Sequence, residues 1–83
     1  MRGWHCTTRA KLARYKATGG ILPPVRFWRY ESSARDWAKR KQRTVVLQIE
    51  VDVAHPLPDH KPSGHAWWSN QIVRKWRDVT DVA

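Results

Sequence analysis

A histidine, a thiol and two hydroxyls stand next to one another near the N-terminus, as His5, Cys6, Thr7 and Thr8. A cysteine beside a basic imidazole can act as a nucleophile, and both residue types are also zinc ligands. Neighbouring residues of a strand point to opposite faces, however, so the His5 and Cys6 side chains would not meet. We therefore expect this segment to form a first strand rather than a thiol active site.

The remaining histidines are the other residues that could bind a metal ion. They lie five positions apart in a proline-containing segment, as His55, His60 and His65. A structural zinc site needs four ligands in a tetrahedron, usually supplied as closely spaced pairs. No histidine pair has such a spacing, and one cysteine cannot supply a thiolate-rich site. The sequence predicts no metal site.

Arginines and aromatic residues alternate in the segment 25–30, VRFWRY. On a strand, Arg26, Trp28 and Tyr30 would share one face, with Arg29 on the other. A face with arginine and aromatic rings can hold phosphates and stack on bases. It can equally belong to a core strand whose arginine stems pack over tryptophan. Both interpretations stay open.

Two further groups extend this candidate contact surface. The basic residues that follow VRFWRY continue its positive charge, and exposed tryptophan often anchors an interface. Because adjacent strand residues cannot both point inward, we expect one residue of the pair at 67–68 to be core and the other exposed. The predicted binding residues are Arg26, Trp28, Arg29, Tyr30, Arg35, Lys39, Arg40, Trp67 and Trp68.

Charge is distributed unevenly along the 83 residues, whose net charge is +9. Positions 1–43 hold twelve Lys or Arg and two Asp or Glu, whereas positions 44–83 hold four and five. So basic an N-terminal half attracts a polyanion or an acidic protein surface. The length indicates a single domain over 1–83, the one cysteine excludes an intrachain disulfide, and no apolar run approaches the roughly 20 residues of a membrane span. We expect a cytoplasmic protein with no membrane partner.

Strands are indicated by alternation of apolar and polar residues and by β-branched enrichment. The segment 44–53 is the clearest, because valine, leucine and isoleucine occupy every second position. The predicted strands are 3–7, 25–30, 44–53 and, after a proline-rich loop at 54–66, 74–79.

Two helices are indicated by capping residues and apolar spacing. The first, 9–17, is capped by Thr7 or Thr8, ends at the glycine pair 19–20, and presents a flat alanine face to the sheet. The second, 34–41, is capped by Ser32 or Ser33. Its buried residues are Ala34, Trp37 and Ala38, and its outward residues are Arg35, Asp36, Lys39 and Arg40. With a helical turn at 69–73, the prediction is a small α+β fold in the order β-α-β-α-β-loop-β, with two helices on one face of a single sheet.

Over about residues 3–53, this order resembles the N-terminal part of an ADP-ribosyltransferase-like domain. In that family a first strand carries His followed closely by Thr, as His5 and Thr7 do here. A helix ending in glycine, an aromatic strand, an alanine-rich charged helix and a strongly apolar strand follow. The resemblance implies NAD as cofactor, with His5 holding the nicotinamide ribose and Tyr30 or Trp28 stacking on the nicotinamide.

The chain departs from the family at its third functional residue, a glutamate near the end of the domain. The last glutamate here is Glu50, and the nearest substitute is Gln71, which carries no charge. Without that carboxylate, electrostatic stabilisation of the transition state would be weakened.

Two main functions from different classes stay open, beside a third, a structural or assembly protein whose charge only steers its association. The first, which we favour, is a small basic binding module without a cofactor, whose N-terminal half engages nucleic acid or a host nucleic-acid-handling protein complex. Its size, single cysteine and uneven charge are similar to those of small phage and mobile-element proteins such as anti-CRISPR inhibitors, which implies inhibition of a defence complex in a bacterial host. The alternative is a minimal, degenerate NAD-dependent ADP-ribosyltransferase with His5 and Tyr30 as its catalytic residues.

Overall fold

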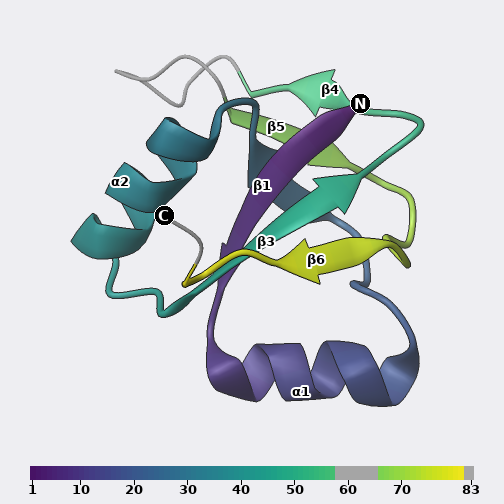
Figure 1. Cartoon of the computed structure of the whole chain (residues 1–83). Helices are drawn as coiled ribbons and strands as arrows, with labels where there is room; N and C mark the ends of the chain where they lie inside the picture. Colours follow the sequence, from purple (N-terminus) through teal and green to yellow (C-terminus); the bar gives the residue numbers. More distant parts are fainter. Residues whose placement is uncertain (58–65, 82–83) are drawn as a thin grey trace.

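The computed structural model describes residues 1–57 and 66–81, which form two helices and one antiparallel sheet of six strands (Figure 1). The predicted α+β class and element order are confirmed, with two short strands added after the third. The sheet order is β4-β5-β2-β1-β3-β6. The bounds are β1 Arg2–Thr7, α1 Arg9–Thr18, β2 Val25–Trp28, α2 Glu31–Arg40, β3 Val45–Glu50, β4 His55–Pro56, β5 Ala66–Ser69 and β6 Trp76–Asp78.

Helix α1 begins and ends at the predicted signals. The Thr8 hydroxyl accepts a hydrogen bond from the Lys11 backbone N–H, and Gly19 closes the helix with φ 80°, a left-handed conformation that costs glycine little. The predicted alanine face is wrong, since the three alanines are exposed and Leu12 is the buried residue of the helix. Helix α1 lies across one end of the strands (Figure 1). Its contacts with the apolar cluster of the sheet are made by Leu12 and Tyr15.

Helix α2 begins three residues earlier than predicted. Its N-cap is Tyr30, whose side chain makes no capping hydrogen bond, and Glu31 in the first turn suits the positive end of the helix dipole. The predicted caps Ser32 and Ser33 therefore lie inside the helix. Its predicted inner face is correct, with the two alanines buried and Trp37 half-buried.

The two helices pack against opposite faces of the sheet, so the prediction of one shared face is wrong. Strand β3 shows why, because Val46 is buried as well as Val45 and Leu47, and alternate residues point to opposite faces. One apolar cluster contains Leu12 of α1 with Val25, Phe27, Val45, Leu47 and Ile49, and the other contains Ala34 and Ala38 of α2 with Trp28, Val46, Ala66 and Val79.

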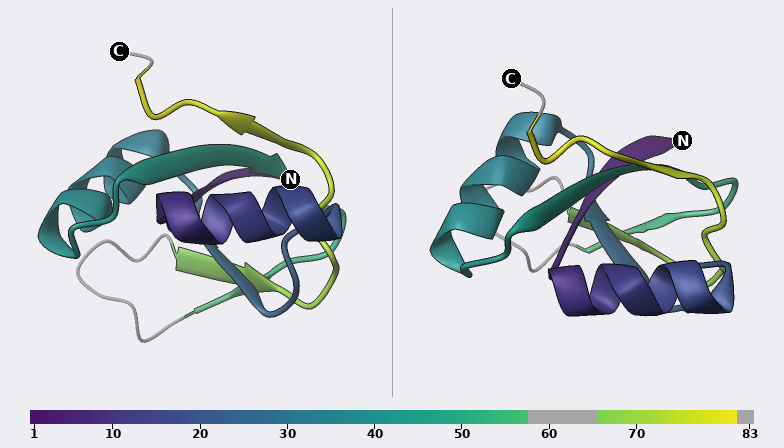
Figure 2. Two further views of the ribbon diagram at one scale, coloured as in Figure 1. Left: turned by 90° about the horizontal axis from the view of Figure 1, so that it is seen from below. Right: turned by 60° about the horizontal axis from the view of Figure 1, so that its bottom comes forward.

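The sheet is strongly bent. Figure 2 shows β3 and β6 on one side and β4 and β5 on the other, with α1 across the opening between them. Gly3 of β1 allows the close packing inside this bend, since a Cβ there would lie 2.1 Å from the Phe27 ring. Neither α1 nor α2 has the length and apolarity of a membrane-spanning helix.

The C-terminal part is extended rather than helical after β5. Val73 and Ile21 exchange backbone hydrogen bonds of 2.8 and 3.0 Å, so the predicted turn at 69–73 is wrong. The predicted final strand is confirmed as β6. The predicted loop at 54–66 contains β4 and the first residue of β5, and its residues 58–65 lie outside the described part of the chain.

Candidate ligand-binding cleft

Strands β1 and β2 pair at one position and then separate. Trp4 lies opposite Trp28, whereas β1 pairs with β3 along all six of its residues. Where the backbone ladder to β2 stops, the His5 side chain reaches across, and its Nδ1 lies 2.5 Å from the carbonyl oxygen of Arg26. Because a carbonyl only accepts hydrogen bonds, Nδ1 carries the proton and donates it.

A chain of hydroxyl groups continues from the other side of the His5 ring. Its Nε2 lies 3.2 Å from the Tyr15 hydroxyl, which lies 3.1 Å from the hydroxyl of Thr7. With Nδ1 protonated, Nε2 of the neutral ring accepts from Tyr15, and Thr7 then donates to Tyr15. This chain holds His5 in one tautomer and one orientation.

The environment of His5 keeps its imidazole neutral. Burial is the main cause that lowers the pKa of His5, and the positive charges of Lys11 and Arg43 lower it further. The hydrogen bond to the Arg26 carbonyl acts in the opposite direction without reversing the shift. Lys11 and Arg43 also line the same cleft as His5.

The separation of the two strands leaves a cleft of about 300 Å³. It is lined by residues of β1, β2, β5, both helices and the connecting segments, and none of the described lining residues is Asp or Glu. The guanidinium carbon of Arg43 lies 6.0 Å from the centroid of the Trp37 ring, and the Trp37 and Trp28 ring centroids are 6.2 Å apart. The cations and aromatic rings of the lining are Lys11, Arg26, Arg43, His5, Tyr15, Phe27, Trp28 and Trp37.

Two of the nine predicted binding residues, Arg26 and Trp28, line this cleft. Arg26 is exposed, whereas Trp28 is buried, so the contact and core interpretations of VRFWRY each describe part of the segment. Arg29 and Tyr30 follow the end of β2 and are exposed, and neither belongs to the lining. The exposed positions Lys39 and Arg40 lie in the last turn of α2, also outside the cleft.

The tryptophan pair of β5 divides between the two faces of the sheet. Trp67 pairs with Phe27 and packs against the cluster on the α1 side. Trp68 lies on the other face, where its ring centroid is 4.8 Å from that of His55. The two side chains point to opposite faces of the sheet, as expected. Both are half-buried, however, so the expected difference in exposure between a core residue and an exposed residue is not found.

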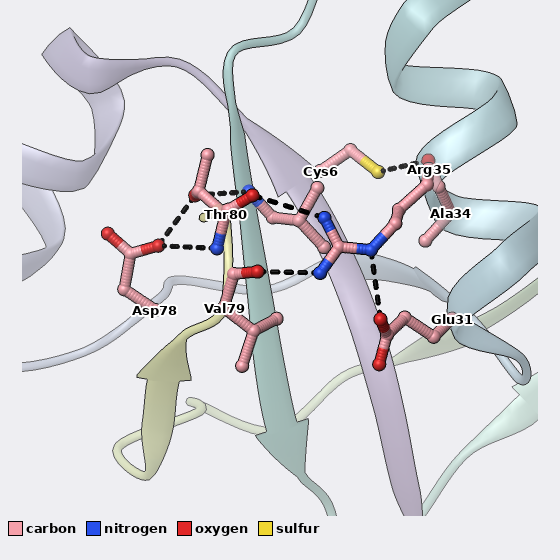
Figure 3. A network of polar contacts seen from close by, with 8 residues as sticks. Cys6, Glu31, Ala34, Arg35, Asp78, Val79 and Thr80 are labelled. Carbon is pink, nitrogen blue, oxygen red and sulfur yellow. Dashed lines mark hydrogen bonds and ion pairs between the residues drawn. The ribbon is translucent and has the colours of Figure 1, made fainter. Parts of the chain in front are cut away.

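Arg35 does not lie outward as predicted, because its guanidinium holds the fold together (Figure 3). Its Nε donates to Glu31 at 2.9 Å, and its two terminal nitrogens donate to the backbone carbonyls of Thr80 at 3.2 Å and Val79 at 2.6 Å. These bonds connect α2 to the segment after β6, which sequence periodicity could not reveal because 44 and 45 residues separate the partners.

Cys6 lines the cleft as a protonated thiol. Its Sγ donates to the Ala34 carbonyl at 3.0 Å, and burial raises the pKa of Cys6 to about 12. A nucleophilic cysteine needs a lowered pKa, so this environment disfavours thiol chemistry. Within residues 1–57 and 66–81, no three His, Cys, Asp or Glu side chains gather as metal ligands, and His60 and His65 lie outside that part.

Four residues of the cleft wall were not among the predicted binding residues: Lys11, Tyr15, Trp37 and Arg43. Trp37 was assigned to the core alone, and Tyr15 had a usable signal, since it follows Leu12 by three positions on the same helix face. Nothing local marks Lys11 or Arg43 among the other basic residues. No family model, curated protein or solved structure matches this chain.

The neutral, partly buried imidazole of His5 predicts a stability that falls as the pH is lowered from 7 to 5. The unfolded chain takes up a proton near the ordinary pKa of 6.5, before the folded chain does, so protonation favours unfolding. For this one group the free energy of unfolding should drop by at most about 1.4 kcal/mol per pH unit. The free energy of unfolding, measured with urea at pH 7, 6 and 5, should change less with pH in His5→Gln than in the wild type. Equal dependences would show that His5 is not a buried neutral group.

Proposed function

We propose that this chain is a nucleotide-binding domain that holds its ligand in the cleft between β1 and β2. The observation that carries the proposal is the joint lining of the cleft by cations and aromatic rings, without a carboxylate among the described lining residues. A nucleotide matches both features, since it has an anionic phosphate and a planar base.

The phosphate is proposed to lie near His5, between Lys11 and Arg43. Neither cation forms an ion pair with a described carboxylate, and both act electrostatically on His5. Positive charge concentrated in a cleft attracts anions more strongly than the same charge spread over an open surface. A bound phosphate would reduce the mutual repulsion of these cations.

The base is proposed to lie against the tryptophans of the cleft. Trp28 is fixed in the core beneath α2, while Trp37 is half-buried with Arg43 beside its ring. Stacking of a base on an aromatic side chain contributes about 1–3 kcal/mol and tolerates any base. A nucleic-acid end carries the same phosphate and base, so the proposed ligand agrees with the expected partner, nucleic acid or a complex that handles it.

The alternative function, an NAD-dependent transferase, is favoured by the position of His5 at the cleft with Trp28 nearby. It is disfavoured by the placement of Glu50 and Gln71, the two candidates for the position of the family's glutamate. Glu50 pairs with Arg2 at the far end of β1, at 3.0 Å, and the Gln71 side chain accepts hydrogen bonds from the backbone of 52–53. Binding without turnover is therefore our proposal, and nicotinamide release from NAD that His5→Ala abolishes would favour the enzyme instead.

Titration with AMP and with ribose 5-phosphate tests the proposed function. AMP should bind more tightly, by about tenfold or more, because only AMP can stack a base in the cleft. Replacement of the half-buried Trp37 by leucine should remove most of this difference and leave the affinity for ribose 5-phosphate within about threefold. Isothermal titration calorimetry measures both ligands on both proteins. Absence of AMP binding at millimolar concentration, or equal AMP affinity in Trp37→Leu, would refute a base site in this cleft.

A further inference from the structure

A row of three side chains crosses β2, β5 and β4 next to the cleft. Arg26 lies opposite Trp68, and Trp68 lies opposite His55. Residues that face each other across antiparallel strands have side chains on the same face and within contact range. Trp28, two positions after Arg26, shares this face and lines the cleft, so the row continues from the cleft wall onto the sheet surface.

The row combines the two kinds of side chain that bind single-stranded nucleic acid. Arg26 and His55 are exposed, and the half-buried Trp68 ring is stacked at a tilt of 37° against His55. The strands β2, β4 and β5 contain no acidic residue, whereas β3 and β6 each end with one. Arg26 can hold a backbone phosphate, and Trp28 and Trp68 beside it on this face offer stacking surfaces for successive bases.

We propose that Trp68 is a second base-stacking site, and that the ligand is a single-stranded oligonucleotide whose first nucleotide occupies the cleft. This inference rests on the proposed function. Arg26 belongs to both the cleft wall and the row, so it can contact the phosphate that joins the two nucleotides. Adjacent strands lie about 4.8 Å apart, so Trp68 is within reach of a nucleotide joined to the one in the cleft.

The neighbouring Trp67 has a different, structural role. It pairs with Phe27 and packs against the apolar cluster on the α1 side. Trp68 is the member of the pair whose ring lies on the face with Arg26 and His55. The WW pair therefore supplies one structural residue and one proposed contact residue.

The test compares AMP with the 5′-phosphorylated dinucleotide pApA. Wild-type protein should bind pApA about tenfold or more tightly than AMP, because a second base stacks. Trp68→Leu should remove this gain while AMP affinity stays within about twofold, which also shows that the variant is folded. Trp68→Phe should retain most of the gain. His55→Ala, at an exposed position, is the second variant and should reduce the gain by loosening the Trp68 ring.

The outcomes separate this inference from the proposed function. AMP binding with no gain for pApA, or a gain that persists in both Trp68→Leu and His55→Ala, would overturn the second stacking site and leave the cleft intact. Binding of pApA that depends on Trp68, without AMP binding, would support the Trp68 site and overturn the cleft. Binding of neither ligand would overturn both.

Discussion

Reversal of two charges at the cleft, Lys11→Glu with Arg43→Glu, should weaken AMP binding by at least about a hundredfold. A hydrogen bond to a charged group contributes about 1.5–3 kcal/mol, and tenfold in affinity corresponds to about 1.4 kcal/mol. The double variant loses two such contacts and places carboxylates beside the phosphate. Because both side chains belong to the cleft lining and neither pairs with a described carboxylate, the fold should lose little stability.

The matched control reverses two charges outside the cleft, Arg14→Glu with Lys39→Glu. Both residues are exposed, and the change in net charge is the same. Its AMP affinity should fall by less than about threefold, measured by calorimetry at two salt concentrations to separate long-range attraction from contact. Equal losses in the two double variants would mean that the overall positive charge attracts the ligand and that the cleft does not select it.

Arg35→Glu should destabilise the fold by about 2–4 kcal/mol, a large fraction of the stability of a small domain. The substitution removes the guanidinium that donates to Val79 and Thr80 and sets two carboxylates one helical turn apart, at Glu31 and position 35. The Arg35 side chain is only 30% exposed, so water replaces these contacts incompletely. Urea unfolding of the variant measures the loss.

Lys39→Glu is the control on the same helix and should change the free energy of unfolding by about 0.5 kcal/mol or less, because Lys39 is exposed. Arg35→Lys keeps the charge without the forked geometry and should give an intermediate loss. A stability of Arg35→Glu within 0.5 kcal/mol of wild type, on the same scale, would contradict the role of Arg35 in joining α2 to the C-terminal segment.

Local signals in the sequence predicted the elements whose stability is itself local. The Thr8 cap and the Gly19 terminus of α1 are set by hydrogen bonds within a few residues, and the alternate apolar residues of β3, Val45, Leu47 and Ile49, are all buried on one face. The start of α2 was mispredicted because Tyr30 contributes no capping side chain. The extended course near Val73 depends on Ile21, which lies 52 positions earlier.

The cleft could not be predicted, because it results from a non-local event. The spacing of Arg26 and Trp28 placed these two residues on one strand face, and both line the cleft. Nothing in the sequence shows that β1 leaves β2 after a single pair, or that the His5 ring then hydrogen-bonds to the Arg26 carbonyl. The cleft wall combines residues of both helices and three strands, which only the assembled fold brings together.

Two-dimensional 1H–15N NMR during an AMP titration tests whether the nucleotide lies in the cleft, because it locates the ligand in the folded protein. We expect saturable shifts at the backbone amides of His5, Thr7, Lys11 and Arg43 and at the Trp37 indole N–H, with the Lys39 amide nearly unchanged. Shifts confined to exposed basic positions such as Lys39 and Arg40, or no saturable shift at the cleft residues, would contradict this placement of the nucleotide.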